Sequence, residues 1–216
     1  MGLRAAGAPT SSFSHERGLA RVRITMATTA AGDGRITRER YWQLVADGTI
    51  GPEDRVELLD GVIVAIAPPA AAHDQALSQL SRLLFVGLGP GLSTRVQLPL
   101  EIGACTTTEP DIAVVEGYAE AYAAANPTTA ALVVEVADST VSQDRLTKGP
   151  LYAAGGIPEY WIVNLRDGCV EIYRKPVPAE RRYAERMVAG PGDRLQTPCL
   201  RERQIAVSDV LPLADS

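Results

Sequence analysis

The chain has little of what marks several common classes of protein. Its three cysteines, Cys105, Cys169 and Cys199, lie far apart and form no CxxC pair and no cluster with histidine. A structural zinc site and a disulfide framework are therefore not expected. No apolar run reaches about 18 residues, so no membrane span is expected, and the N-terminus lacks the apolar stretch of a secretory signal. A cytoplasmic protein with reduced thiols fits these absences best.

Aromatic residues and lysine are also scarce. Aromatics make up 5% of the chain, so we expect a mainly aliphatic core. Lys148 and Lys175 are the two lysines among 21 basic residues, which makes arginine the usual basic residue here. The net charge of −5 argues against a protein that coats nucleic acid through bulk charge, although a local basic patch stays compatible with it. Neither a Walker-type phosphate loop nor a GxSxG nucleophile motif is present.

The 216 residues suit one domain with a tail. Residues 1–34 are rich in Ala, Gly, Ser, Thr and Arg without sustained periodicity, so we predict a disordered tail, with Met26 as an alternative start. Residues 35–216 are expected to form a single domain. Removing the tail takes away four arginines and two acids, which leaves 17 basic against 24 acidic residues, a charge of about −7.

The pattern of apolar residues predicts a mixed α/β domain with helices packed against a central sheet. Thr37 is a helix N-cap candidate, with Gly48 as the stop, and Asp60-Gly61 is a hairpin turn between two apolar runs. A second helix is expected over residues 72–88 and a third over 142–156, with a kink or restart at Pro150. Strands are expected over residues 94–102, 111–115 and 131–136, and on both sides of the turn at 167–168.

Two carboxylates interrupt strands that are otherwise apolar. Asp111 follows Pro110 at the entry of one strand, and Glu135 lies inside the next, on the same face as Val133 and Ala137. An ionised carboxylate this close to a core requires a partner. The partner is either an arginine or a metal ion such as Mg²⁺, which prefers hard oxygen ligands.

The helix that follows Glu135 carries Asp144 and Lys148, four residues apart on one face. This pair is either an ordinary surface ion pair or part of a site. A lysine where the chain otherwise uses arginine favours a compact ammonium group with a specific task.

These residues resemble those of a known superfamily. Pro110-Asp111, Glu135 and a following lysine, in the order helix, three strands, helix, strand, resemble the PD-(D/E)xK restriction-endonuclease-like superfamily. The segments "VELLDGVIV", "EPDIAVV" and "LVVEVADSTVSQDRLTKGPLYAAGGIPEYWIVNL" are similar to the Uma-type family, a "putative endonuclease" family long classed as a domain of unknown function. The resemblance extends from about Arg35 to Tyr173. It implies an α+β restriction-endonuclease-like core, in which helices flank a mixed sheet and an N-terminal helix and hairpin precede it.

The resemblance also implies an activity and a site. The activity would be metal-dependent endonucleolytic hydrolysis of DNA, with Mg²⁺ or alternatively Mn²⁺ held by Asp111, Glu135 and the backbone carbonyl of Val136. Lys148 would orient or activate water and stabilise charge on the phosphate. In the superfamily the lysine stands two residues after the acid, where this chain has Ala137, so the resemblance implies that the lysine has moved to the next helix.

Further residues match the family around this set. Glu57, His73 and Asp144 would line the site, although His73 could instead cap a helix and Glu57 could pair with Arg55. Tyr160 and Trp161 are expected to pack in the core. Five arginines are candidates for contacts with phosphate: Arg82, Arg95, Arg145, Arg166 and Arg174.

Two other functions stay open at this point. The chain could be a non-catalytic nucleic-acid-binding module on the same fold, or an interaction protein that depends on a partner. Related nucleases often pair to cut both strands, which leaves a homodimer open.

Overall fold

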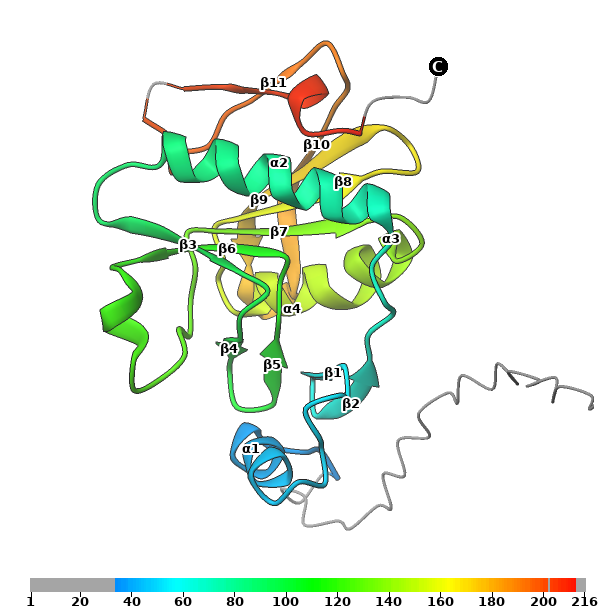
Figure 1. The fold of residues 1–216 in the computed structure, drawn as a ribbon, viewed down its shortest axis with the longest axis vertical. Coiled ribbons are helices and arrows are strands. Elements are labelled where there is room, and N and C mark those ends of the chain that lie inside the picture. The colour runs from blue at the N-terminus through cyan, green and yellow to red at the C-terminus, as the bar shows by residue number, and fades with distance from the viewer. Residues whose placement is uncertain (1–33, 202, 213–216) are drawn as a thin grey trace, which may run out of the picture.

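The computed structural model describes residues 34–201 and 203–212. The predictions of a disordered tail and of a start at Met26 concern residues outside this range. A large sheet and a small lobe make up the molecule (Figure 1). Within the described residues, no helix combines the length and the apolar character that crossing a bilayer would require.

The large sheet has six strands in the order β10-β9-β8-β7-β6-β3. They are β3 (Leu92–Val96), β6 (Ile112–Glu116), β7 (Leu132–Ala137), β8 (Glu159–Asn164), β9 (Cys169–Val177) and β10 (Arg182–Ala189). Neighbours run antiparallel except β7 and β8, which are parallel. A parallel pair needs a crossover connection, and here the connection carries the third predicted helix.

Helices cover both faces of this sheet (Figure 1). Helix α2 (Ala71–Gly87) packs on the face that carries Val134 and Val136. The crossover consists of α3 (Val141–Gln143), a π-helical turn (Asp144–Lys148) and α4 (Gly149–Ala154), and it covers the opposite face, with Val133 and Ala137. Because side chains alternate along a strand, Glu135 points toward the crossover. The predicted interruption near Pro150 is confirmed, since the π-helical turn ends just before that residue.

The small lobe contains α1 (Arg38–Ala46) and a four-stranded sheet in the order β2-β1-β5-β4. Its strands are β1 (Val56–Leu59), β2 (Val62–Ala65), β4 (Leu100–Ile102) and β5 (Thr106–Thr108). Thr37 is the N-cap of α1, as predicted, and its side chain accepts a hydrogen bond from the Arg40 N–H. The predicted hairpin turn is also confirmed: Asp60 and Gly61 both have positive φ. A Cβ on Gly61 would lie 2.5 Å from the Cβ of Arg35, so glycine is required there.

The prediction of one strand over residues 94–102 is wrong. The chain forms β3 in the large sheet, turns at Gln97 with a φ of 49°, and continues as β4 in the small lobe. Strand β5 was not predicted, because "TTT" has no apolar alternation. Helix α1 ends at Ala46, and the predicted stop residue Gly48 follows the C-cap Asp47 with a φ of 76°. The C-terminal part adds β11 (Arg194–Leu195), β12 (Ile205–Ala206) and a 3₁₀ helix over Val207–Asp209; two further 3₁₀ helices span Ala119–Tyr122 and Pro178–Glu180.

The packing of α2 gives a first test. Leu80 is fully buried against the large sheet, whereas Leu146, on the crossover, is 78% exposed. Leu80→Ala should lower the free energy of unfolding by ~2–5 kcal/mol through the cavity it leaves. Leu146→Ala, the same chemical change on the surface, should stay within ~0.5 kcal/mol. Urea unfolding of both variants checks this, and equal losses would show that α2 is not held as described.

Candidate functional site

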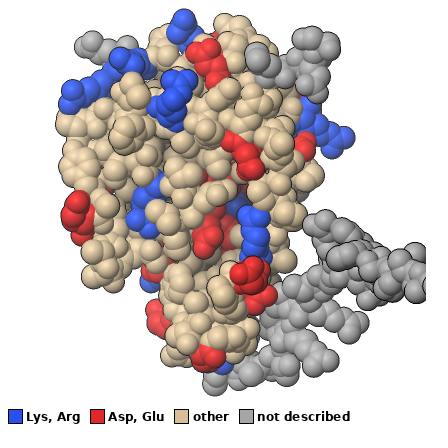
Figure 2. All heavy atoms as spheres, viewed as in Figure 1, with Lys and Arg blue, Asp and Glu red and all other residues tan. Residues whose placement is uncertain are grey.

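A cavity of about 370 Å³ lies where the small lobe meets the large sheet. The cavity is surrounded by the start of β1, the end of β2, the start of α2, the entry of β6, the end of β7 and the π-helical turn. Figure 2 shows acidic and basic atoms side by side in the hollow between the lobe and the larger body. All seven residues singled out from the sequence line this cavity: Glu57, His73, Asp111, Glu135, Val136, Asp144 and Lys148.

Asp111 is buried and held at both carboxylate oxygens. Its Oδ1 lies 3.1 Å from His73 Nε2 and accepts a hydrogen bond of 3.2 Å from the side-chain amide of Gln97. Its Oδ2 accepts a bond of 2.8 Å from the Val136 N–H. Burial raises the pKa of Asp111, but the bonds from His73 and Val136 outweigh it and hold the pKa below its usual value. The bond to Asp111 in turn raises the pKa of His73. His73 therefore contacts a residue outside its own helix and does not act as a purely local helix cap.

Five side chains form a closed ring of hydrogen bonds next to Asp111. The Lys148 ammonium lies 3.0 Å from Glu135 Oε1 and 3.2 Å from Glu57 Oε2. The Thr108 hydroxyl donates to Glu57 Oε1 at 2.6 Å and lies 3.2 Å from the Tyr152 hydroxyl. Tyr152 closes the ring by donating to Glu135 Oε1 at 2.6 Å. The ring joins β1 and β5 of the small lobe to β7 of the large sheet and to the crossover.

The ring contains more negative than positive charge. Burial alone would lower the pKa of Lys148, but Glu135 and Glu57 raise it, so its amine stays an ammonium. Burial raises the pKa of Glu135 well above its usual value, and the carboxylates of Asp144, Asp111 and Glu57 add to this against the opposing effect of Lys148. Over the whole cavity, six acidic residues face Arg55, Lys148 and His73. A further cation in the cavity would therefore be stabilised.

Asp144 and Lys148 are not a surface ion pair, because they are only 3% and 7% exposed. Asp144 accepts a hydrogen bond of 3.0 Å from the Thr140 hydroxyl, and its backbone carbonyl accepts one of 3.3 Å from the Tyr160 hydroxyl. Burial raises the pKa of the Asp144 carboxyl to about 6.

The donor set fits a small divalent cation better than a thiolate or imidazole metal. No group of three or more His, Cys, Asp or Glu side chains within residues 34–201 and 203–212 is arranged to hold a metal. The oxygen donors gathered here are the carboxylates of Asp111 and Glu135 and the backbone of Val136. In a strand the N–H and C=O of one residue project to the same side, and the Val136 N–H faces Asp111. Its carbonyl oxygen is therefore on the Asp111 side of β7.

Some residues around the site carry no signal in the sequence, and the arginine that lines the cavity is not among the five candidates. Thr108, Tyr152 and Gln97 carry no pattern that marks them in isolation. None of the five arginines proposed for phosphate contacts lines the cavity, which Arg55 does instead. The guanidinium groups of three of them are already engaged within the described structure: Arg145 by Glu171, Arg174 by Glu159, and Arg95 by Pro99, Asn126 and the Tyr122 ring. Tyr160 and Trp161 are fully buried, as predicted.

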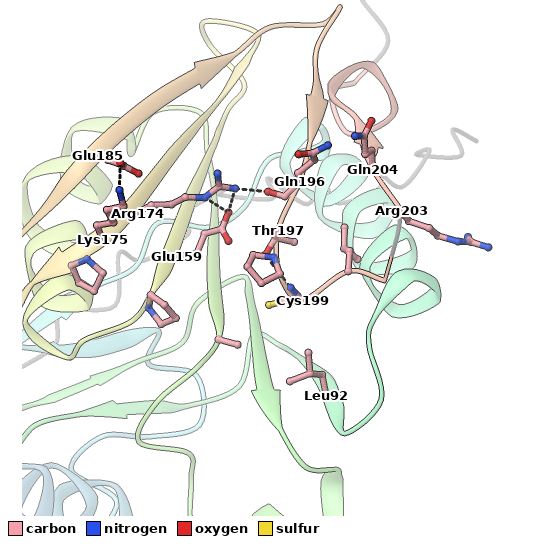
Figure 3. Close-up of a pocket in the computed structure, with 15 residues that line it drawn as sticks. Leu92, Glu159, Arg174, Lys175, Glu185, Gln196, Thr197, Cys199, Arg203 and Gln204 are labelled. Atoms are coloured by element: carbon pink, nitrogen blue, oxygen red, sulfur yellow. Dashed lines mark hydrogen bonds and ion pairs between the residues drawn. The ribbon is translucent and has the colours of Figure 1, made fainter.

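A second hollow, of about 860 Å³, opens at the opposite end of the large sheet (Figure 3). Four of its charged groups form two pairs: Arg174 donates to Glu159 at 2.7 Å, and Lys175 to Glu185 at 2.5 Å. A fifth charged residue, Arg203, also lines it. Pro158, Pro176, Leu92 and Cys199 supply much of the remaining wall. Two acidic residues against three basic ones line this hollow, so it offers less to a metal ion than the smaller cavity with its six acidic residues.

The raised pKa of Asp144 predicts a pH-dependent stability. The folded state binds its proton more tightly than the unfolded state, so this contribution to stability is full below pH 3.8 and is lost as the pH rises through about 6. Asp144→Asn should remove the loss and raise the free energy of unfolding at pH 7.5 by up to ~3 kcal/mol, with little gain at pH 4. Asp138→Asn, at an exposed residue of the same cavity, is the control. Urea unfolding at both pH values checks this; equal gains at both would contradict it.

Comparison with known proteins agrees with this architecture. A crystal structure of a protein from Anabaena variabilis ATCC 29413, described as "a putative nuclease belonging to DUF820", superposes with a TM-score of 0.64. The match covers 81% of this chain and 97% of the other at 19% sequence identity, which shows a shared fold. No curated protein sequence matches this chain.

A family model matches most of the chain. It spans residues 38–208 and is that of Uma2, described as "Putative restriction endonuclease". The matched range includes the small lobe, the large sheet and every residue of the cavity. The chain therefore belongs to the Uma2 family of restriction-endonuclease-like proteins.

Proposed function

We propose that the protein is a metal-dependent endonuclease that hydrolyses phosphodiester bonds in DNA. One observation carries the proposal: Asp111 and Glu135, from adjacent strands, line one cavity of a nuclease-like fold, and a buried ammonium group binds Glu135 there. Buried carboxylates with a fixed ammonium beside them are the groups that a phosphoryl-transfer site requires.

Mg²⁺ is the ion that these residues suit best, with Mn²⁺ as the alternative. Asp111, Glu135 and the Val136 carbonyl would hold it, because both ions prefer oxygen ligands. The excess of acidic groups in the cavity supports a site for a divalent cation. When bound, such an ion supplies a water molecule of lowered pKa and neutralises charge on the scissile phosphate.

The protein's own residues would orient this chemistry. His73 and Gln97 fix Oδ1 of Asp111, and the Val136 N–H fixes Oδ2, so the carboxylate is oriented before any ligand arrives. Lys148 is protonated, because Glu135 and Glu57 raise its pKa. It would therefore stabilise negative charge on the phosphate as a fixed donor, and it would not act as a general base.

A first experiment tests the ion and the reaction together. Wild type should bind Mg²⁺ or Mn²⁺ in calorimetry and nick plasmid DNA, and Asp111→Asn and Glu135→Gln should lose both, because each removes an oxygen anion from the site. Glu116→Gln, at the exposed far end of β6, is the control and should behave as wild type. A wild type that binds neither ion would refute the metal site. Metal binding without nicking would favour the non-catalytic nucleic-acid-binding module.

A second experiment separates Lys148 from the metal ligands. Lys148→Met should lower the nicking rate by at least ~100-fold, as for loss of a charge-stabilising group, while calorimetric metal binding persists because the carboxylates remain. Lys175→Met replaces the exposed lysine and should leave both measurements unchanged. Since Lys148→Met leaves Glu57 and Glu135 without their ammonium, its fold should be checked by circular dichroism with Mg²⁺ present. Full nicking by a folded Lys148→Met would exclude the lysine from the reaction.

A further inference from the structure

A second buried carboxylate, Glu171, lies outside the cavity. It is fully buried on β9, inside the alternating run "CVEIYR". Arg145 Nε donates to both of its oxygens at 3.0 Å, and the side chains of Asn164, Tyr173 and Arg186 donate to it as well. Burial raises the pKa of Glu171, but these donors outweigh it and hold the pKa at about 2, so the carboxylate is ionised at neutral pH.

Glu171 and Glu135 lie in one row of the large sheet. Glu135 pairs with Ile162 across β7 and β8, and Ile162 pairs with Glu171 across β8 and β9. Paired residues point to the same face, so two carboxylates flank one isoleucine beneath the crossover. The π-helical turn above them carries two basic residues three positions apart: Arg145 binds Glu171, and Lys148 binds Glu135.

The same turn also contacts β8, the strand between β7 and β9. The Tyr160 hydroxyl, from β8, donates to the Asp144 carbonyl. One turn is thus attached by polar side chains to β7, β8 and β9. π-Helical turns are rare and frequently lie at functional sites.

The two basic contacts differ in rigidity. Arginine binds both oxygens of a carboxylate in a fixed planar geometry, whereas a lysine ammonium is a point charge on a flexible four-carbon stem. The Arg145–Glu171 pair is therefore the more rigid of the two contacts.

We propose that Glu171, acting through Arg145, is a positioning residue that holds Lys148 between Glu135 and Glu57. The role of Lys148 in hydrolysis rests on the proposed function, but its placement does not. Glu171 does not line the cavity, so its loss should displace the ammonium while the carboxylates of Asp111 and Glu135 stay in place.

The scarcity of lysine provides a direct measurement. In a Lys175→Arg background, protein labelled with ¹⁵N-lysine has a single side-chain ammonium signal, that of Lys148. With Glu171 intact, this buried group should give a sharp NMR signal protected from exchange with solvent. Glu171→Gln should speed exchange by at least about tenfold, because the turn opens locally. Glu171→Asp, which keeps the charge, should retain part of the protection.

A matched variant distinguishes positioning from general stability. Glu159 is another buried acid paired with an arginine, Arg174, at the start of β8. Glu159→Gln should destabilise the fold comparably but leave the Lys148 signal unchanged. If Glu171→Gln and Glu159→Gln speed the solvent exchange of the Lys148 ammonium equally, or if neither speeds it, the proposal is wrong. Arg145→Gln removes the more exposed partner of the Arg145–Glu171 pair. If Glu171→Gln does not fold, Arg145→Gln should show the same faster exchange at Lys148, and unchanged exchange would refute the proposal.

Enzyme kinetics give a second readout. Glu171→Gln should lower kcat for nicking by about tenfold with KM nearly unchanged, as expected when a group that acts in the transition state is displaced. If wild type does not nick DNA, the proposed function fails, and the NMR signal still decides whether Glu171 positions Lys148. An unchanged kcat together with an unchanged exchange rate at the Lys148 ammonium would show that Glu171 does not position Lys148.

Discussion

The ammonium group of Lys148, shared by Glu57 and Glu135, is the interaction on which the rest of the site depends. It joins carboxylates from two different sheets, one in the small lobe and one in the large sheet. Buried ions of this kind are costly to remove from water, and breaking such a pair typically costs ~3–5 kcal/mol because an uncompensated charge remains. The small lobe forms one wall of the cavity, and the contact of Glu57 with Lys148 helps to hold the lobe against the large sheet.

The same charges explain why the site is suited to a cation. Thr108 and Tyr152 satisfy part of the hydrogen-bonding capacity of the two glutamates, but hydroxyl groups do not neutralise charge. Lys148 balances one carboxylate of several. Burial raises the pKa of Glu135, and the remaining imbalance adds to this; a divalent ion would relieve the imbalance. Stability without an ion and affinity for one would then oppose each other, as stability and function do at many sites.

Much of the architecture could be predicted from the sequence, for identifiable reasons. The hairpin at Asp60-Gly61, the cap at Thr37 and helix α2 follow from local rules, and the structure confirms them. Asp111 and Glu135 were noticed because they interrupt apolar strands. Glu171 gives the same signal inside "CVEIYR" and could have been found in the same way. Strand β5 and the closed ring could not, because they depend on pairing between segments some 50 residues apart, as between Glu57 and Thr108. The break at Gln97 could not either, because it reflects the change from pairing with β6 to pairing with β5.

The single parallel pair in the large sheet has a consequence for the handedness of the site. Connections between parallel neighbouring strands are right-handed almost without exception, because the strands twist in one sense. A connection of given hand can cover only one face of the sheet, and the segment between β7 and β8 is the one that carries Lys148. The face on which the ammonium lies is then dictated by the chirality of L-amino acids, and only its depth and register are left to the side chains.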